Sequence, residues 1–418
     1  MKSRASWTAG ILGLLLLAGA PARGAPADTS GTWKAWTDAV AVAGSKVIAN
    51  LPADLTEQET AEAHQMMVGA LFSAYLSVAS SNPKKPEFVP TLGFYENFFG
   101  PNPDTIYLST LIDGMGSYRL RGNLGQVSFM NLSIQQGPYL GITGKAVPHQ
   151  DHEFAELHPK GNGDFEVLLS ADRPPGYKGD WWRLDAKTER LQLRYVSQDW
   201  AHDRDPTVYI ERLDTPPAAP PSSVQSLYQG LNILPAAIEN SSLQFAHRME
   251  EMEKIQGRNR MFELPIAQLG GMDYQRYVYA AIVLPQDGAV VLETDVPKKC
   301  LYWSLLLTNW LDSTLDWVNY QSSLNSRQAH VDPDGKLRVV ISDTDPGVAN
   351  WMDTVGHRRA GLQLRWTGCD SAPIPTLREV AKIDLRNALP RGTPFVTPAE
   401  RENVLQERRA AALMRKRW

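Results

Sequence analysis

The chain has 418 residues, of which 43% are hydrophobic and 21% charged, and its formal net charge is -4. At roughly 100 to 200 residues per domain, this length predicts two domains or three. The composition is typical of soluble globular proteins and lacks the basic excess that a phosphate backbone requires, so nucleic acid is excluded as a partner.

The N-terminus has the pattern of an export signal. Lys2 and Arg4 precede an apolar run over residues 9–20, and small residues follow up to Gly24 and Ala25, where cleavage is expected. The run is shorter than the roughly 20 residues that cross a bilayer, and no later segment approaches that length. We therefore expect a periplasmic or secreted protein, cleaved near Gly24/Ala25, with no membrane span.

An N-terminal α+β domain is expected over residues 25–222, after the signal at 1–24. Apolar residues recur at helical spacing in "TWKAWTDAVAVAGSKVIANL" and in "LTEQETAEAHQMMVGALFSAYLSVAS", and Thr56 with Glu59 forms a capping-box pattern before the second helix. Short alternating segments separated by Gly-containing turns then predict an antiparallel meander. A Pro-rich spacer, "DTPPAAPPSS", closes this block.

Connecting helices are expected over residues 223–260, with a break or kink at Pro235 because proline lacks the amide proton that a helix needs. Short strands separated by "DPDG" and "DPG" turns predict a jelly-roll-like β-sandwich over residues 261–375. Residues 376–418 form a predicted tail that ends in an Arg-rich, solvated helix. The predicted fold class is thus α+β.

Two cysteines, Cys300 and Cys369, each border a strand-like segment, and disulfides persist in exported compartments. A bridge needs Cα atoms within about 7 Å, which spacing along the sequence does not decide. A disulfide and two free thiols both stay open at this point. A catalytic cysteine is disfavoured because neither residue has an activating neighbour.

The segment "HQDHEFAELH" contains potential metal ligands at His149, His152, Glu156 and His158. Their spacing differs from the helical zinc motif, in which two histidines lie four residues apart. We interpret the segment as a polar surface hairpin and predict no metal site. The glycine-rich loops that cradle phosphates are also lacking from the sequence, so no cofactor is predicted.

The first candidate site lies in "FYENFFGPNPDTIYLST". Prolines flank Asn102 there, so Asn102, Asp104 and Tyr107 would be held at fixed angles where a loop enters a strand, an arrangement that suits ligand binding. The alternative is that the Asn and Asp side chains only cap the turn.

The second candidate site lies in the opposite half, around His357. Its imidazole is suited to proton transfer near neutral pH, because the unperturbed pKa of His is about 6.5. If one helical turn joins Asp353 to His357, the two share a face and the carboxylate orients the imidazole. The alternative is a satisfied loop histidine with Asp353 as an N-cap. Polar and Trp side chains accompany this pair as candidate substrate-binding groups: Asn309, Trp310, Asn319, Asn350 and Trp351.

These passages resemble a known family. "NPDTIYLSTLIDGMGSYRL" and, more strongly, the run from Leu301 to Gly368 resemble exported bacterial proteins that carry domains of unknown function 1254 and 1214, with a divergent 1254-like N-terminal half. The resemblance implies an α+β part, a jelly-roll-like sandwich and a polar pocket near their junction, and it implies no established activity. The polar positions that match are Asn102, Asp104, Tyr107, Trp310, Asn319, Gln321, Asp345, Pro346, Gly347, Asn350, Trp351, Asp353 and His357.

Two functions are weighed. The first is a metal-independent lyase, isomerase or hydrolase that acts on a small hydroxylated or carbonyl-bearing molecule, with His357, Asp353 and Asp104 as catalytic groups. The second is a non-catalytic binder of carbohydrate or another small ligand, which stacks on Trp310, Trp317 and Trp351. In a third interpretation, the Trp rings only fill the core. The oligomeric state is left open.

Overall fold

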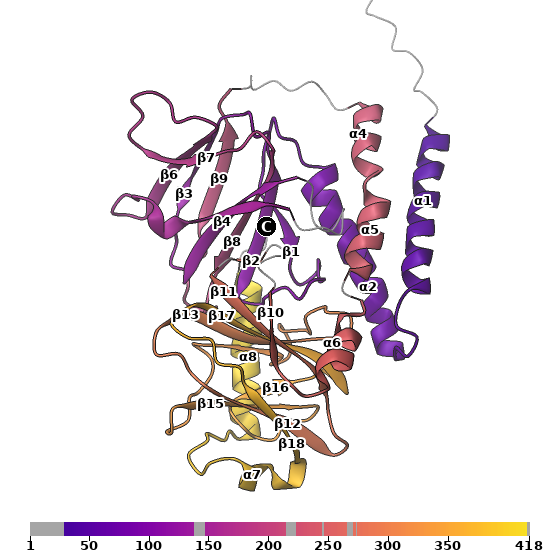
Figure 1. Ribbon diagram of the computed structural model, residues 1–418, viewed down its shortest axis with the longest axis vertical. Coiled ribbons are helices and arrows are strands. Elements are labelled where there is room, and N and C mark those ends of the chain that lie inside the picture. The colour runs from indigo at the N-terminus through magenta and orange to yellow at the C-terminus, as the bar shows by residue number, and fades with distance from the viewer. Residues whose placement is uncertain are drawn as a thin grey trace, which may run out of the picture.

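The computed structural model describes residues 29–137, 147–214, 223–244, 246–265, 271–272 and 274–415, so the predicted export signal lies outside the described residues. The fold mixes helices with mostly antiparallel sheets (Figure 1). The α-helices are α1 (Ser30–Ala49), α2 (Glu57–Ala74), α4 (Val224–Leu231), α5 (Leu234–Leu243), α6 (Arg248–Gln256), α7 (Leu385–Ala388) and α8 (Pro398–Met414). Short π and 3₁₀ helices are η1 (Tyr75–Ala79), η2 (Phe154–Glu156) and η4 (Lys382–Asp384).

The N-terminal half contains two sheets. One has the order β1-β2-β8-β4-β5, with β1 (Val89–Leu92), β2 (Thr105–Leu111), β8 (Thr188–Val196), β4 (Phe129–Gln136) and β5 (His149–Glu153). The other has the order β7-β6-β3-β9, with β7 (Asp180–Arg183), β6 (Asp164–Ser170), β3 (Tyr118–Asn123) and β9 (Thr207–Arg212). One hydrophobic core joins them, since Leu132 and Leu193 of the first sheet pack with Leu120 and Val167 of the second.

The C-terminal half also contains two sheets. One has the order β10-β11-β17-β13-β14, with β10 (Phe262–Leu264), β11 (Gln275–Val283), β17 (Arg359–Cys369), β13 (Cys300–Thr308) and β14 (Ser323–Asn325). The other has the order β16-β15-β12-β18, with β16 (Trp351–Asp353), β15 (Lys336–Ser342), β12 (Gly288–Asp295) and β18 (Thr376–Ala381). They share a second core. Because β18 pairs with β12, the sheet continues beyond the boundary predicted at residue 375.

The two halves repeat one topology. Adding nine to each strand number of the N-terminal sheets gives the strand order of the C-terminal sheets, and the parallel pair β6 and β7 has its counterpart in β15 and β16. The sequence "LQLR" occurs at residues 191–194 and 362–365, at the same place in each half. Arg194 is registered with Tyr107, as Arg365 is with Tyr277. The structure therefore consists of two copies of one nine-stranded unit, which the sequence analysis did not predict.

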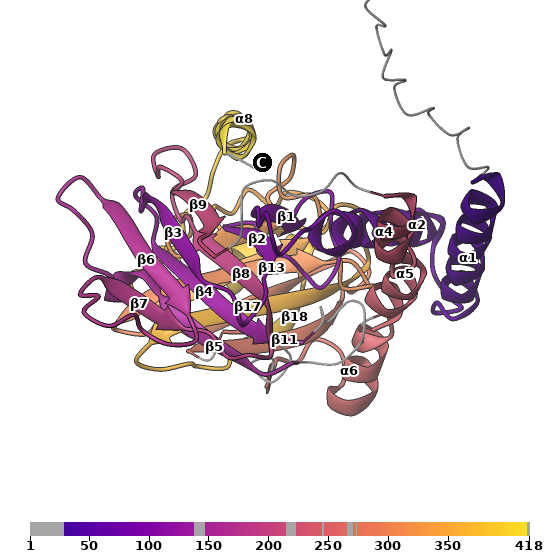
Figure 2. The same ribbon diagram turned by 90° about the horizontal axis from the view of Figure 1, so that it is seen from above.

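The two halves lie one above the other, with their five-stranded sheets facing each other (Figure 1). Contacts join these sheets directly: Asn102 Nδ2 donates to the Tyr302 hydroxyl at 2.8 Å, and the rings of Phe129 and Tyr302 have centroids 6.0 Å apart. Helices α1, α2, α4 and α5 stand together along one side, and α8 runs along another (Figure 2). As predicted, the connecting helix is broken near Pro235, which lies in the first turn of α5.

The pairing of β13 with β17 decides whether the two cysteines are free or bonded. Cys300 and Cys369 occupy directly paired positions of β13 and β17, and they form a disulfide.

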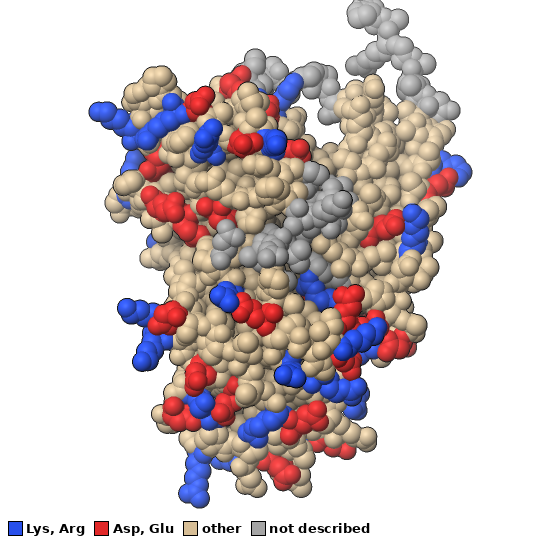
Figure 3. All heavy atoms as spheres, viewed as in Figure 1, with Lys and Arg blue, Asp and Glu red and all other residues tan. Residues whose placement is uncertain are grey.

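Within the described residues, no helix has the length and apolar character needed to cross a membrane. Acidic and basic side chains are interspersed over the face shown in Figure 3, whereas the surface over α1 and α4 carries few of either.

Candidate functional site

A pocket of about 760 Å³ opens where α2 meets both halves. One wall is the helix itself, from Glu62 to Phe72, and another is the segment 94–97 between β1 and β2. Residues 309–316, which follow β13, and the turn that carries His357 complete the lining. The pocket thus joins four parts of the chain that lie far apart in sequence.

The start of helix α2 fixes the direction in which its acidic side chains point. Thr56 and Glu59 form the predicted capping box, in which Thr56 N donates to Glu59 Oε2 at 2.8 Å and Glu59 N donates to Thr56 Oγ1 at 3.2 Å. This fixes the helix start, and residues three apart lie on one face of a helix. Glu59 and Glu62 therefore both face the turn between β16 and β17.

The carboxylate of Glu62 gathers three donors. Its Oε2 lies 3.0 Å from His357 Nε2 and 2.8 Å from Asn309 Nδ2, while its Oε1 accepts from Gln58 Nε2 at 3.2 Å. On the other side of the ring, His357 Nδ1 lies 2.9 Å from the carbonyl oxygen of Thr354. Because each ring nitrogen faces an acceptor, the arrangement favours an imidazolium that donates from both nitrogens.

The electrostatic environment agrees with that protonation state. Burial acts to lower the pKa of His357, but the hydrogen bond and negative charge of Glu62, with the Thr354 carbonyl, outweigh it and raise the pKa above its usual value. The side chain is only 3% exposed, and Glu62 is 22% exposed. A buried imidazole whose protonated form is favoured is thus held beside a carboxylate at the pocket wall.

A second ion pair fixes the same turn to α2. Arg359 binds Glu59 through Nε to Oε1 at 2.8 Å and through Nη2 to Oε2 at 3.0 Å, and it also pairs with Asp54 at 2.6 Å. Its guanidinium lies 5.0 Å from the centre of the Trp310 ring. The position of His357 is therefore set by its neighbour two residues later as well as by Glu62.

The predicted pairing of Asp353 with His357 is wrong. The carboxylate of Asp353 accepts from Val355 N at 2.7 Å, and burial raises its pKa. The segment is a tight turn at the end of β16, with positive φ at Val355 and Gly356, and so the four-residue spacing of a helical face does not apply. Glu62 occupies the role expected of Asp353.

Asp104, a predicted catalytic group, lies elsewhere. It is 3% exposed and accepts from the Tyr302 hydroxyl at 2.5 Å, from Trp200 Nε1 at 2.7 Å and from Asn325 Nδ2 at 2.8 Å. Burial raises the pKa of Asp104, and these hydrogen bonds oppose that rise. Asn102 donates to the same Tyr302 hydroxyl. Asp104 and Asn102 thus join the two halves and are not among the residues lining the 760 Å³ pocket.

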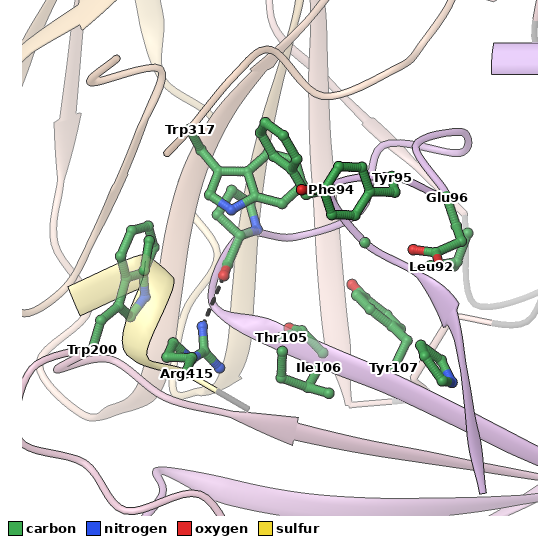
Figure 4. Close-up of a pocket in the computed structure, with 14 residues that line it drawn as sticks. Leu92, Phe94, Tyr95, Glu96, Thr105, Ile106, Tyr107, Trp200, Trp317 and Arg415 are labelled. Atoms are coloured by element: carbon green, nitrogen blue, oxygen red, sulfur yellow. Dashed lines mark hydrogen bonds between the residues drawn. The ribbon is translucent and has the colours of Figure 1, made fainter. Parts of the chain in front are cut away.

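Tyr107 lines a different, narrow cleft of about 50 Å³ (Figure 4). Its hydroxyl accepts from the backbone of Asn102 at 3.1 Å. Tyr95 belongs to the lining of both cavities, so the cleft and the larger pocket share a wall. At the other end of the cleft, Arg415 Nη1 donates to the Pro103 carbonyl at 2.9 Å.

Of the other predicted binding residues, only Asn309 reaches the large pocket. Trp310 and Trp351 are 1% and 5% exposed and pack against Arg359 and Arg401, so they offer no stacking surface. Asn350 is buried and bonds backbone groups of His330 and Arg338. Asn319 is exposed and contacts Asp316 and Arg409.

The histidines of "HQDHEFAELH" are dispersed. His152 stacks on Trp182 with ring centroids 4.8 Å apart, and His158 Nδ1 lies 2.7 Å from Asp180. In the part of the chain that the structure describes, no three His, Cys, Asp or Glu side chains form a group able to hold a metal ion.

One wall of the pocket lies in a segment that is similar to a known family. Residues 289–370 match the model of the protein family of unknown function DUF1214. This range includes His357 and Asn309 and lies far from Glu62 in the sequence. No match to domain 1254 accompanies it, and no curated protein matches the sequence.

One solved structure resembles most of the chain. An uncharacterized protein from Burkholderia cenocepacia is 25% identical, with a TM-score of 0.77 over 84% of this chain and 97% of that one. A protein from Vibrio parahaemolyticus is 12% identical, with a TM-score of 0.44 over 76% of this chain and 97% of that one. The first similarity supports the mixed fold described above.

Glu62 and Gln58 were not among the predicted site residues. Both lie on a helix whose acidic residues were interpreted only through the capping box. The spacing of Glu59, Glu62 and Met66 could have identified them. It places two carboxylates on the face of α2 that also carries apolar residues. Acidic residues on a buried helical face require a partner, and that partner lies in the opposite half.

Proposed function

We propose that this protein is an acid-base enzyme, a lyase, isomerase or hydrolase, that acts on a small hydroxylated or carbonyl-bearing molecule in the 760 Å³ pocket. The observation that carries this proposal is the contact of 3.0 Å between His357 Nε2 and Glu62 Oε2 at the pocket wall. A charged imidazole is an acid near neutral pH, and its neighbouring carboxylate is a base. Proton transfer between these two groups and a substrate requires no metal ion.

The two groups have complementary roles. His357 gives the proton on Nε2 to an oxygen of the substrate, which replaces Glu62 Oε2 as the acceptor of that proton, and Glu62 takes a proton from the substrate. In an elimination from a β-hydroxycarbonyl compound, for example, Glu62 removes the Cα proton, and the Cα=Cβ double bond forms as the Cβ–O bond breaks. His357 protonates the departing hydroxyl to give water. Asn309 holds Glu62 in place at 2.8 Å.

The lining favours an uncharged substrate. Glu62 and Asp316 supply carboxylates, and no Lys or Arg lies among the described lining residues. Phe72, Phe94 and Tyr95 give the wall an apolar, aromatic part. Anionic molecules would meet like charge there, whereas a neutral molecule with one face apolar would fit.

The alternative of a carbohydrate binder finds less support. Trp310, Trp317 and Trp351 are 1%, 6% and 5% exposed, as the core-filling interpretation expects. A non-catalytic binder would have to use the aromatic wall of the large pocket instead.

We also propose that both halves are jelly-roll-like sandwiches, that the N-terminal half is related to domain 1254, and that the protein is exported to the periplasm or secreted.

The proposal is tested first by ligand binding and then by catalytic turnover of the ligands that bind. Neutral hydroxy-carbonyl compounds, sugars and aromatic alcohols are screened by thermal shift, and the compounds that bind are incubated with the protein and followed by NMR. We expect His357→Gln to bind the active compound and to convert it about 10²- to 10⁴-fold more slowly. The matched control is His202→Gln, whose ring is exposed and pairs with Asp199. Full activity of the His357 variant would overturn the assignment.

A further inference from the structure

A layer of buried polar side chains lies between the two five-stranded sheets. In each "LQLR" repeat the leucines point into the core of their own half, and the Gln and Arg therefore point to the opposite face. These faces meet, and their side chains are buried: Gln192 is 8% exposed, Arg194 6%, Gln363 0% and Arg365 5%. Burying an arginine from each half in this layer requires a compensating arrangement.

Arg365 is incompletely satisfied. Its Nη2 donates to the Gly100 carbonyl at 2.7 Å and to Gln363 Oε1 at 2.9 Å. Its Nη1 is buried and has no hydrogen-bond partner. Both partners of Nη2 are neutral, and no carboxylate among the described residues forms an ion pair with this guanidinium.

The acidic group that acts on Arg365 is already engaged. Asp312 is fully buried and pairs with Arg248 at 2.7 Å, while its other oxygen accepts from Gln363 Nε2 at 3.0 Å. Burial raises the pKa of Asp312, and Arg248, Gln363 and Arg365 oppose the rise. The carboxylate of Asp312 therefore shares its charge among several groups and forms its ion pair with Arg248.

The other neighbours of Arg365 are phenols. Four phenols act electrostatically on it, those of Tyr107, Tyr279, Tyr277 and Tyr302. A phenol has an ordinary pKa of about 10, and burial raises the pKa of Tyr277 and Tyr302 further, so these hydroxyls are neutral near pH 7. Phenols supply hydrogen bonds to a ligand but no negative charge.

The duplication adds a second cation. Arg194 occupies the place of Arg365 in the other half, and both arginines act on Tyr277, where they oppose the rise in pKa that burial causes. Beside Arg365 on the same sheet, the directly paired residue Ser304 has a buried hydroxyl that interacts with the phenol of Tyr302. A buried cationic donor without a partner and a buried hydroxyl thus lie on neighbouring strands.

We propose that the layer between the two five-stranded sheets binds a small carboxylate, which accepts from Arg365 Nη1 and from the hydroxyl of Ser304. A buried guanidinium nitrogen without a hydrogen-bond partner is costly, and a carboxylate relieves that cost by pairing with the planar donors of the guanidinium. The site is separate from the pocket at His357 and takes the opposite class of ligand. It stands whether or not the protein is an acid-base enzyme.

The test compares acetate with its neutral isostere acetamide. Acetate binding to the purified protein is measured by calorimetry at fixed NaCl, for wild type, for Arg365→Gln and for Arg276→Gln. Arg276 is the matched control, since it lies on the adjacent strand but its side chain is 59% exposed and pairs with Glu263. We expect acetate to bind and acetamide not to bind. Affinity should fall about 30-fold or more in the Arg365 variant and stay unchanged in the control.

The wild-type protein provides a measurement that does not depend on how the variant folds. Its melting temperature should rise with acetate concentration and should not rise with NaCl at equal ionic strength. Equal effects of the two salts would overturn the assignment to carboxylates. Absence of acetate binding to wild type, or equal affinity in wild type and the Arg365 variant, would overturn the site itself.

Discussion

His357 Nε2 lies 3.0 Å from Glu62 Oε2, although 295 positions separate the two residues in the sequence. The contact links the first half of the chain to the second across the large pocket, and it sets the charge of the imidazole. Its consequences for stability and for ligand binding can be measured separately.

Glu62→Gln should remove the pH dependence that this pair creates. The pKa of His357 is raised in the folded protein, chiefly because Glu62 outweighs burial. The contribution of the pair to stability is therefore full below the unfolded pKa of about 6.5 and is lost as pH rises through the folded value. We expect the free energy of unfolding of wild type to fall over that window more steeply than that of the variant. Parallel curves from urea unfolding between pH 5.5 and 9 would contradict this.

Arg359→Gln should loosen α2 from the second half. The substitution leaves Glu59, whose side chain is 2% exposed, as a buried carboxylate without its cation. Breaking a buried ion pair costs about 3 kcal/mol or more. The same substitution at Arg276 gives the control, because that pair with Glu263 is exposed and contributes about 1 kcal/mol or less. Denaturant titration that shows equal losses in the two variants would refute the docking role.

Asp104→Ala should destabilise the fold and leave ligand binding in the large pocket intact. The change strands three buried donors, on Tyr302, Trp200 and Asn325. At about 1 kcal/mol or more for each, a loss of at least 3 kcal/mol is expected in thermal or urea unfolding. Asp38→Ala, at an exposed pair with Lys34, is the comparison. A stable Asp104 variant that no longer binds pocket ligands would restore the catalytic assignment.

Gly100→Ala should disturb the polar layer between the sheets. Gly100 has a φ of 56°, and a Cβ there would lie 2.4 Å from Gln363 Nε2, the group that binds Asp312. The left-handed backbone alone costs about 1 to 2 kcal/mol, and displacement of Gln363 adds to it. Gly161→Ala, where a Cβ meets open space, should change the melting temperature little. Similar melting temperatures for the two variants would contradict the prediction.

Local patterns in the sequence predicted local structure well. The capping box at Thr56 and the helix break at Pro235 depend on residues within one turn of each other, and both are present. The wrong prediction at Asp353 also concerns local structure. A helical turn was assumed there, but two residues with positive φ make a tight turn.

Relationships between distant segments were not predictable in this way. Glu62 faces His357 only because the second half folds against α2, and a single sequence gives no register between them. The duplication is visible in strand order, whereas the sequences of the two halves share little beyond "LQLR". Strand order depends on backbone pairing, which many different side chains satisfy.

The placement of α2 decides how this chain can be divided. The helix precedes the first half in sequence, yet Glu59 and Glu62 on it hold Arg359 and His357 of the second. A fragment that begins at residue 223 would keep the nine strands of the second half and the imidazole but lose the carboxylate beside it. The complementary fragment would keep a helix whose buried carboxylates have no cations. We therefore expect the two fragments to remain associated after cleavage of the chain between residues 214 and 223.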